Sequence, residues 1–193
     1  MSSPIEVLTQ RLARHTPVEI ALPANEQAAI AVILVPASDL GGLELLLIQR
    51  AIREGDPWSG HMALPGGLRD MGDADLNATA VREAREETGI DLAQARFLGR
   101  LDDLRPIRQS QRSLSVRPFV YCADSRPDLT SSAEVADALW VPLGRLRSCA
   151  GEACVVHRGA PLNVPAYLVD GRTVWGMTQR VLSALLDLSD SDR

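Results

Sequence analysis

The sequence is poor in cysteine, and the few cysteines that it has form no metal-binding or redox pattern. Its 193 residues include no CxxC pair and no Cys/His cluster, and the three cysteines are Cys122, Cys149 and Cys154. An odd number at these spacings argues against a disulfide framework and against a zinc site built from cysteine and histidine. We therefore expect a cytoplasmic protein whose cysteines fill core or loop positions.

The sequence also lacks long apolar runs and an excess of positive charge. No segment approaches the ~20 apolar residues that a membrane span needs, and Met1 to Pro17 has no signal-peptide core. The formal net charge is −5, which argues against general binding to nucleic acids or anionic membranes. We expect an anionic substrate to be attracted by local arginines and a metal ion.

The size and hydrophobic content favour one domain. With 46% hydrophobic residues over 193 positions, the chain suits a single sizeable core. We predict an N-terminal helix and lead-in over residues 1–27, a core over 28–188 and a frayed tail over 189–193. Periodicity predicts helices at Ile5–Arg14, Leu76–Thr88 and Gly176–Leu188. Strands are predicted at Ala28–Val35, Leu43–Ile48, Met62–Leu64, Phe97–Leu101, Leu114–Cys122 and Ala138–Val141, with a hairpin over Tyr167–Trp175. The short strand Met62–Leu64 is expected to lead into a turn at Gly66-Gly67.

The helix predicted at Leu76–Thr88 carries an unusual distribution of charge. Asp75 is a suitable N-cap, and Gly89 suits a left-handed residue after the last turn. The final turn and a half holds three acids, Glu83, Glu86 and Glu87. At this negative end of the helix dipole each acid costs roughly 0.3 to 1 kcal/mol. A bound cation would reverse the sign of that cost.

The spacing of these glutamates indicates a metal site rather than a solvated helix face. Glu83 and Glu87 continue the apolar row of the helix, and buried carboxylates need a partner. Arg82, one turn before Glu86, can hold that carboxylate and leave the other two to converge. An all-oxygen cluster suits Mg²⁺ or Mn²⁺, and a carbonyl from Gly67 can add one more ligand.

The segment REAREETGI, Arg82 to Ile90, resembles the second half of the Nudix hydrolase signature at every fixed position. The first half departs from it, because Asp73 replaces the usual glutamate and eight residues, not seven, separate it from Arg82. This spacing, the LLLIQR segment and Trp175-Gly176 resemble the coenzyme A pyrophosphatase branch. The stretch between Arg50 and Pro65 departs from that branch.

The resemblance implies a Nudix-type α/β/α sandwich with a mixed sheet. It also implies hydrolysis of a nucleoside diphosphate linked to another group, with Mg²⁺ or Mn²⁺ as cofactor. Coenzyme A is the expected substrate, and ADP-ribose, NADH and dinucleotide polyphosphates are alternatives. The implied metal ligands are Glu83, Glu86, Glu87 and Gly67. Arg82 would orient Glu86, and either Glu83 or Glu134 would take the proton of the attacking water.

Several arginines are candidates for binding substrate phosphates, although each can equally be a solvated loop residue. They are Arg50, Arg53, Arg105, Arg108 and Arg112. His61 either hydrogen-bonds substrate or braces its loop. A hypothesis of another class is a regulatory Nudix module that binds a nucleotide without hydrolysing it, but all three signature acids are present. The N-terminal helix caps either the domain or a partner subunit, which leaves a homodimer open.

Overall fold

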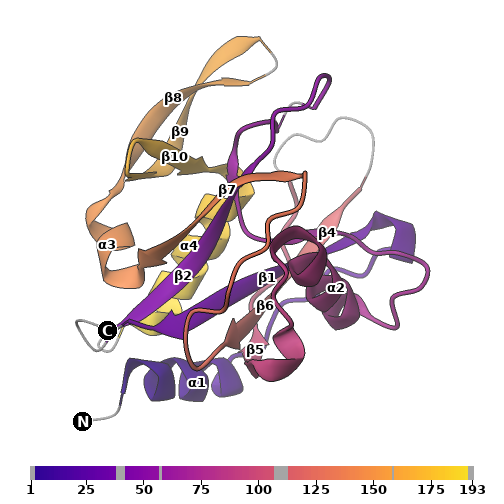
Figure 1. The fold of residues 1–193 in the computed structure, drawn as a ribbon, viewed down its shortest axis with the longest axis vertical. Helices are drawn as coiled ribbons and strands as arrows, with labels where there is room; N and C mark the ends of the chain where they lie inside the picture. Colours follow the sequence, from indigo (N-terminus) through magenta and orange to yellow (C-terminus); the bar gives the residue numbers. More distant parts are fainter. Residues whose placement is uncertain (1–2, 38–41, 57, 107–112, 158, 191–193) are drawn as a thin grey trace.

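A computed structural model of the protein describes residues 3–37, 42–56, 58–106, 113–157 and 159–190. A mixed sheet lies between two layers of helices (Figure 1). Helix α2, Leu76–Thr88, covers one face, and helices α1, Pro4–Arg14, and α4, Gly176–Ser189, cover the other. This arrangement confirms the predicted α/β/α sandwich.

Strand β1, Gln27–Pro36, is the centre of the sheet. It runs parallel to β6 and antiparallel to β2 and β4, while β5 extends the sheet beyond β6, and β3 and β7 both pair with β2. The bounds of these strands are Leu43–Arg50 for β2, Met62–Ala63 for β3, Gly66–Leu68 for β4, Arg96–Arg100 for β5, Ser115–Cys122 for β6 and Val135–Pro142 for β7.

The continuous apolar run of β1 reflects burial on both faces. Ala29, Ala31 and Ile33 belong to the core cluster that includes the apolar side of α2. Val32 and Leu34 alternate with them and belong to the cluster shared by α1 and α4. Because successive side chains of a strand point to opposite faces, a strand covered on both sides has no polar positions to alternate.

Helix α2 begins and ends at the predicted residues. The Asp75 carboxylate accepts a hydrogen bond from the Ala78 N–H at 2.8 Å, and Gly89 has a φ of 75°. Both ends are therefore set by local side-chain and backbone chemistry.

No helix in the described ranges is long and apolar enough to cross a membrane.

A second sheet, of three antiparallel strands, was predicted only in part. Its order is β10-β9-β8, with β8 at Ala150–His157, β9 at Ala160–Val169 and β10 at Arg172–Trp175. The predicted tight turn between β9 and β10 is confirmed, because Asp170 and Gly171 have φ values of 49° and 76°. Strand β8 was missed because its first half, residues 150–153, is largely exposed and consists mostly of small residues. The sheet extends away from the main one (Figure 1).

The prediction of a turn at Gly66-Gly67 was wrong, because these residues form strand β4. Gly66 lies opposite Ile30 and Gly67 opposite Ala29 in the antiparallel pair with β1. The approach is close, since a Cβ on Gly66 would lie 2.4 Å from the Ala29 carbonyl oxygen. Glycine is required here by contact with a neighbouring backbone, which a turn motif in the sequence does not reveal.

We predict that Gly66→Ala lowers the free energy of unfolding by about 2 kcal/mol or more, because the added methyl overlaps backbone atoms of β1 that cannot rotate away. Chemical denaturation monitored by circular dichroism measures the change. Gly72→Ala is the matched control, since nothing lies within 4 Å of a Cβ there. Equal stability of the two variants would contradict the close approach.

Candidate active site

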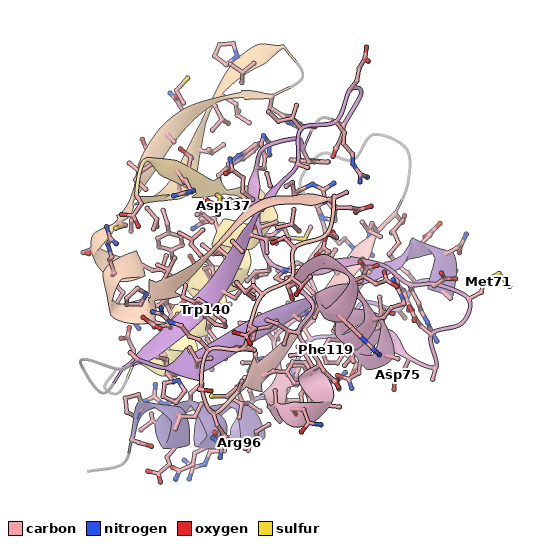
Figure 2. The ribbon with its side chains drawn as sticks, in the orientation of Figure 1. Met71, Asp75, Arg96, Phe119, Asp137 and Trp140 are labelled. Atoms are coloured by element: carbon pink, nitrogen blue, oxygen red, sulfur yellow. The ribbon has the colours of Figure 1, made fainter. Side chains whose placement is uncertain are left out.

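A cleft of about 420 Å³ lies where β4 meets the last turns of α2. It is lined by the segment from Gly66 to Met71 and by Arg50, Arg82, Glu83, Glu87 and Glu134. Figure 2 shows Met71 at the outer end of this segment, with its side chain pointing away from the body of the protein. The cleft therefore brings together residues from β2, β4, α2 and the segment before β7.

Glu87 is the most buried acid of the cleft, with 5% of its surface exposed. The Gly66 N–H donates a hydrogen bond to Glu87 Oε2 at 2.9 Å. Burial raises the pKa of Glu87 to about 7, and the nearby Glu83 carboxylate acts in the same direction. The free-energy cost of charge at this helix end thus comes first from desolvation, whereas the sequence suggested the helix dipole.

Glu83 lies against the backbone of Gly67. A Cβ on Gly67 would fall 2.4 Å from Glu83 Oε1, so only glycine allows the strand and the carboxylate to approach this closely. Burial raises the pKa of Glu83, although Arg82, which donates from Nη1 to Oε1 at 2.8 Å, opposes the shift. Two acids with raised pKa values therefore share one cleft.

Arg82 connects helix α2 to the loop that precedes it. Its Nε and Nη2 donate to the two carboxylate oxygens of Asp73, each at 3.0 Å. Nη1 also donates to Glu86 at 3.0 Å, and Nη2 donates to the Leu68 carbonyl at 3.1 Å. This guanidinium holds the pKa of Asp73 well below its usual range. The expected Arg82–Glu86 pair is present, but Arg82 also engages Glu83, which we had expected to be free.

The three signature glutamates differ in their access to the cleft. Glu83 and Glu87 line it, whereas the Glu86 side chain is 60% exposed and lies outside its lining. Within the described residues, no three His, Cys, Asp or Glu side chains stand together in an arrangement that could hold a metal ion. The donors nevertheless suit Mg²⁺ or Mn²⁺, because the carboxylates of Glu83 and Glu87 both lie against the Gly66-Gly67 backbone of the cleft.

The predicted residues Arg50, Arg53 and Glu134 meet around the cleft. Arg50 donates from Nη2 to Asp56 at 2.8 Å, while its Nε is buried with no hydrogen-bond partner among the described residues. Arg53 pairs with Glu134 at 3.1 Å, and the Glu134 carbonyl accepts from the Ala51 N–H at 2.8 Å. Arg53 itself does not line the cleft.

Of the remaining predicted arginines, the structure describes Arg105, which does not line the cleft. Arg105 is exposed and outside the lining residues, and its carbonyl accepts a hydrogen bond from Arg180 at 2.7 Å. Arg108 and Arg112 lie outside the described residues. Sequence reasoning missed Arg69, which lines the cleft and donates to the Ala74 carbonyl at 3.0 Å. In the sequence, the only indication that Arg69 lines the cleft is its position directly after the strand that contains Gly66-Gly67.

Comparison with known proteins decides the family. The NUDIX domain matches residues 25–158, which span β1 to the second sheet and include the whole cleft. This chain belongs to the Nudix family. Nudix hydrolases cleave pyrophosphate bonds, act on small-molecule nucleotides and generally use divalent metals such as Mg²⁺ or Mn²⁺. The resemblance noted in the sequence is therefore confirmed.

Individual Nudix relatives differ in how much of their length they share with this chain. It is 44% identical over 108 residues to the uncharacterized protein C14C4.10c of Schizosaccharomyces pombe, over 53% of this chain but only 32% of that protein. It is 30% identical over 166 residues to the mitochondrial coenzyme A diphosphatase NUDT8 of Homo sapiens, over 83% and 69% of the two chains. The crystal structure of a NUDIX hydrolase from Alicyclobacillus acidocaldarius matches 91% of this chain and 95% of its own, at 22% identity and a TM-score of 0.55, and shares the fold.

We predict that metal-free protein becomes less stable as pH rises through about 7, because Glu87 keeps its proton in the folded state after it has lost it in the unfolded chain. The stabilisation is complete below the unfolded pKa of 4.5 and is lost as pH rises through the folded pKa of about 7. That shift corresponds to about 3 kcal/mol at most. Denaturant titrations in a chelator between about pH 5 and 8 measure it.

The Glu87→Gln variant should lack this component of the pH dependence, because the amide does not titrate. Glu86→Gln, on the same helix but with an exposed side chain, should retain it. The same slope in wild type and Glu87→Gln would show that another group is responsible.

Proposed function

We propose that this Nudix protein hydrolyses the pyrophosphate bond of coenzyme A or its derivatives, giving 3′,5′-ADP and 4′-phosphopantetheine. The observation that carries the proposal is the cleft between β4 and α2, where Glu83, Glu87 and Glu134 meet Arg50 and Arg82. Such a site combines acids for a divalent cation with arginines for phosphate oxygens. The 30% identity to a coenzyme A diphosphatase over 83% of this chain supports the choice of substrate.

In this proposal Glu83, Glu86 and Glu87 hold Mg²⁺ or Mn²⁺, together with the Gly67 carbonyl. Bound there, the cation would neutralise phosphate oxygens and lower the pKa of the attacking water. Arg82 positions Glu83 and Glu86 through the hydrogen bonds from its Nη1. A set containing all three glutamates requires Glu86 to turn toward the cleft, where the other two already lie.

Glu134 is the proposed general base for the attacking water, and Glu83 is the alternative. Glu134 comes from the segment before β7, and its side chain is about half exposed where it lines the cleft. It pairs with Arg53, so its position does not depend on Arg82, the arginine that holds Glu83 and Glu86. Glu83 is already committed to Arg82 and to the proposed cation.

Two arginines are placed to receive phosphate groups. Arg50 and Arg69 both line the cleft, and the buried Nε of Arg50 has no acceptor among the described residues. A phosphate oxygen would supply that acceptor through a charge-assisted hydrogen bond. A chain with a net charge of −5 needs such local cations to bind a substrate with three phosphate groups.

We predict that Glu87→Gln lowers kcat by about a hundredfold or more, because the neutral amide is a poor ligand for a divalent cation. The fold should persist, since the amide oxygen can still accept from the Gly66 N–H. Steady-state hydrolysis of coenzyme A at saturating Mn²⁺, with circular dichroism as the test of folding, measures both effects. Glu152→Gln, an exposed position on β8, is the control and should match wild type. Full turnover by Glu87→Gln would remove Glu87 from the ligand set.

The substrate itself is tested by comparing coenzyme A with dephospho-coenzyme A, which lacks only the 3′-phosphate. We expect kcat/KM for the dephospho compound to be lower by about tenfold, the effect of losing one charge-assisted contact of about 1.4 kcal/mol. Parallel assays with ADP-ribose, NADH and diadenosine polyphosphates complete the experiment. A much faster reaction with any of these would reassign the substrate within the Nudix range.

A further inference from the structure

Four aromatic rings from three separate segments form a cluster beside the candidate active site. Trp58 and His61 come from the segment after β2, His157 ends β8, and Trp175 ends β10. The Trp58 ring centre lies 5.0 Å from that of His157, 5.7 Å from His61 and 6.0 Å from Trp175. His61 and Trp175 are 5.1 Å apart. Two of the four rings therefore come from the second sheet, and the other two come from the segment between β2 and β3.

The cluster is incompletely covered and incompletely hydrogen-bonded. Trp58 touches all three of the other rings, yet 38% of its surface remains exposed. The Nδ1 atom of His157 is buried and has no hydrogen-bond partner among the described residues. A buried polar atom without a partner is costly, which suggests that a ligand completes the site.

The Asp56 carboxylate links the cluster to the cleft, and the Arg50 N–H adds a second link through its hydrogen bond to the His61 carbonyl at 3.0 Å. Asp56 accepts from Arg50 Nη2 with one oxygen at 2.8 Å and from the Trp58 N–H with the other at 2.9 Å. Arg50 lines the cleft, and its buried Nε is the second polar side-chain atom without a partner in the described part of the chain. The two unpaired nitrogens, Arg50 Nε and His157 Nδ1, therefore flank the same short loop. The first lies on the side of the cleft, and the second belongs to the aromatic cluster.

We propose that the exposed part of the Trp58 ring stacks on the nucleobase of the substrate, and that the base, on binding, displaces the cover of His157 Nδ1 and hydrogen-bonds this atom through its edge. This inference rests on the proposed function, because it places the phosphates of the same molecule at Arg50. Trp58 would then determine the preference for a nucleotide over other pyrophosphates. Bases stack on aromatic side chains whatever their sequence context, since every base has a π-face.

The chemistry of the cluster favours a base over the pantetheine or acyl end of the substrate. Pantetheine can offer an amide or hydroxyl group to His157, but it has no flat aromatic face to stack on Trp58. A purine offers both a flat face and ring nitrogens or an amine at its edge. Burial lowers the pKa of His61, which keeps this neighbouring ring uncharged near neutral pH and suited to packing.

The test measures binding of the two halves of coenzyme A separately, without turnover. Calorimetric titration of the full chain with 3′,5′-ADP and with 4′-phosphopantetheine, in Mg²⁺, gives Kd for each. We expect Trp58→Leu to weaken the binding of 3′,5′-ADP by about tenfold and Trp58→Phe to restore most of the lost affinity. His157→Phe, which keeps a ring but removes the nitrogen, should weaken 3′,5′-ADP by about threefold. The Kd of 4′-phosphopantetheine, and that of inorganic pyrophosphate titrated in the same way, should not change in any of these variants.

The matched control is Trp140→Phe. Trp140, labelled in Figure 2, lies on β7 and packs against the core cluster beneath α2. It should leave both Kd values unchanged. In wild type, 3′,5′-ADP should also quench tryptophan fluorescence, and Trp58→Leu should remove most of that quenching, since only Trp58 and Trp175 of the three tryptophans belong to the cluster.

Three results would overturn the inference: no binding of 3′,5′-ADP to wild type, an unchanged Kd in folded Trp58→Leu, or equal weakening of both halves. Hydrolysis assays separate this result from the proposed function. If coenzyme A is cleaved but Trp58→Leu binds 3′,5′-ADP normally, the function stands and the base site fails. If coenzyme A is not cleaved but the Kd changes occur as expected, the base site stands and the substrate must be another nucleotide.

Discussion

The close approach of strand β4 to the last turns of helix α2 is the constraint on which the site depends. Gly66 has no room for a side chain beside β1, and Gly67 has none beside Glu83. Because both positions are glycine, the strand can lie against the helix and donate the Gly66 N–H to Glu87. The same contact removes two carboxylates from water, and the desolvation raises their pKa values. Keeping these carboxylates charged therefore costs stability in the ligand-free protein.

Arg82 forms hydrogen bonds with some of the acids around it but not with all of them. It engages Asp73 with two hydrogen bonds and also reaches Glu83 and Glu86, but it has no contact with Glu87. The most buried acid is therefore left with one backbone N–H as its partner. Asp73, which departs from the Nudix signature in type and spacing, gives Arg82 a bidentate carboxylate. The departure is accommodated because the loop carries the shorter side chain to the guanidinium.

The segment between β2 and β3 links the phosphate chemistry to the second sheet. Asp56 binds Arg50 on one side and the backbone of Trp58 on the other, and Trp58 packs on rings from β8 and β10. This is the stretch in which the sequence departs from the coenzyme A branch. A change in its length or composition would move both an arginine of the cleft and the aromatic cluster. The geometry of the cleft and the position of the second sheet are thus physically coupled.

The sequence by itself determined helix α2 to the residue, the buried central strand and the arginine–glutamate pattern, because caps, spacing and apolar runs act within a few residues of one another. Only the tertiary structure decided that Gly66-Gly67 is a strand, that Arg50 reaches the cleft while Arg105 does not, and that burial dominates the pKa of Glu87. The rings of Trp58, His157 and Trp175 likewise come from distant segments. Their contacts depend on how the second sheet folds over the loop, and no local pattern of residues encodes that geometry.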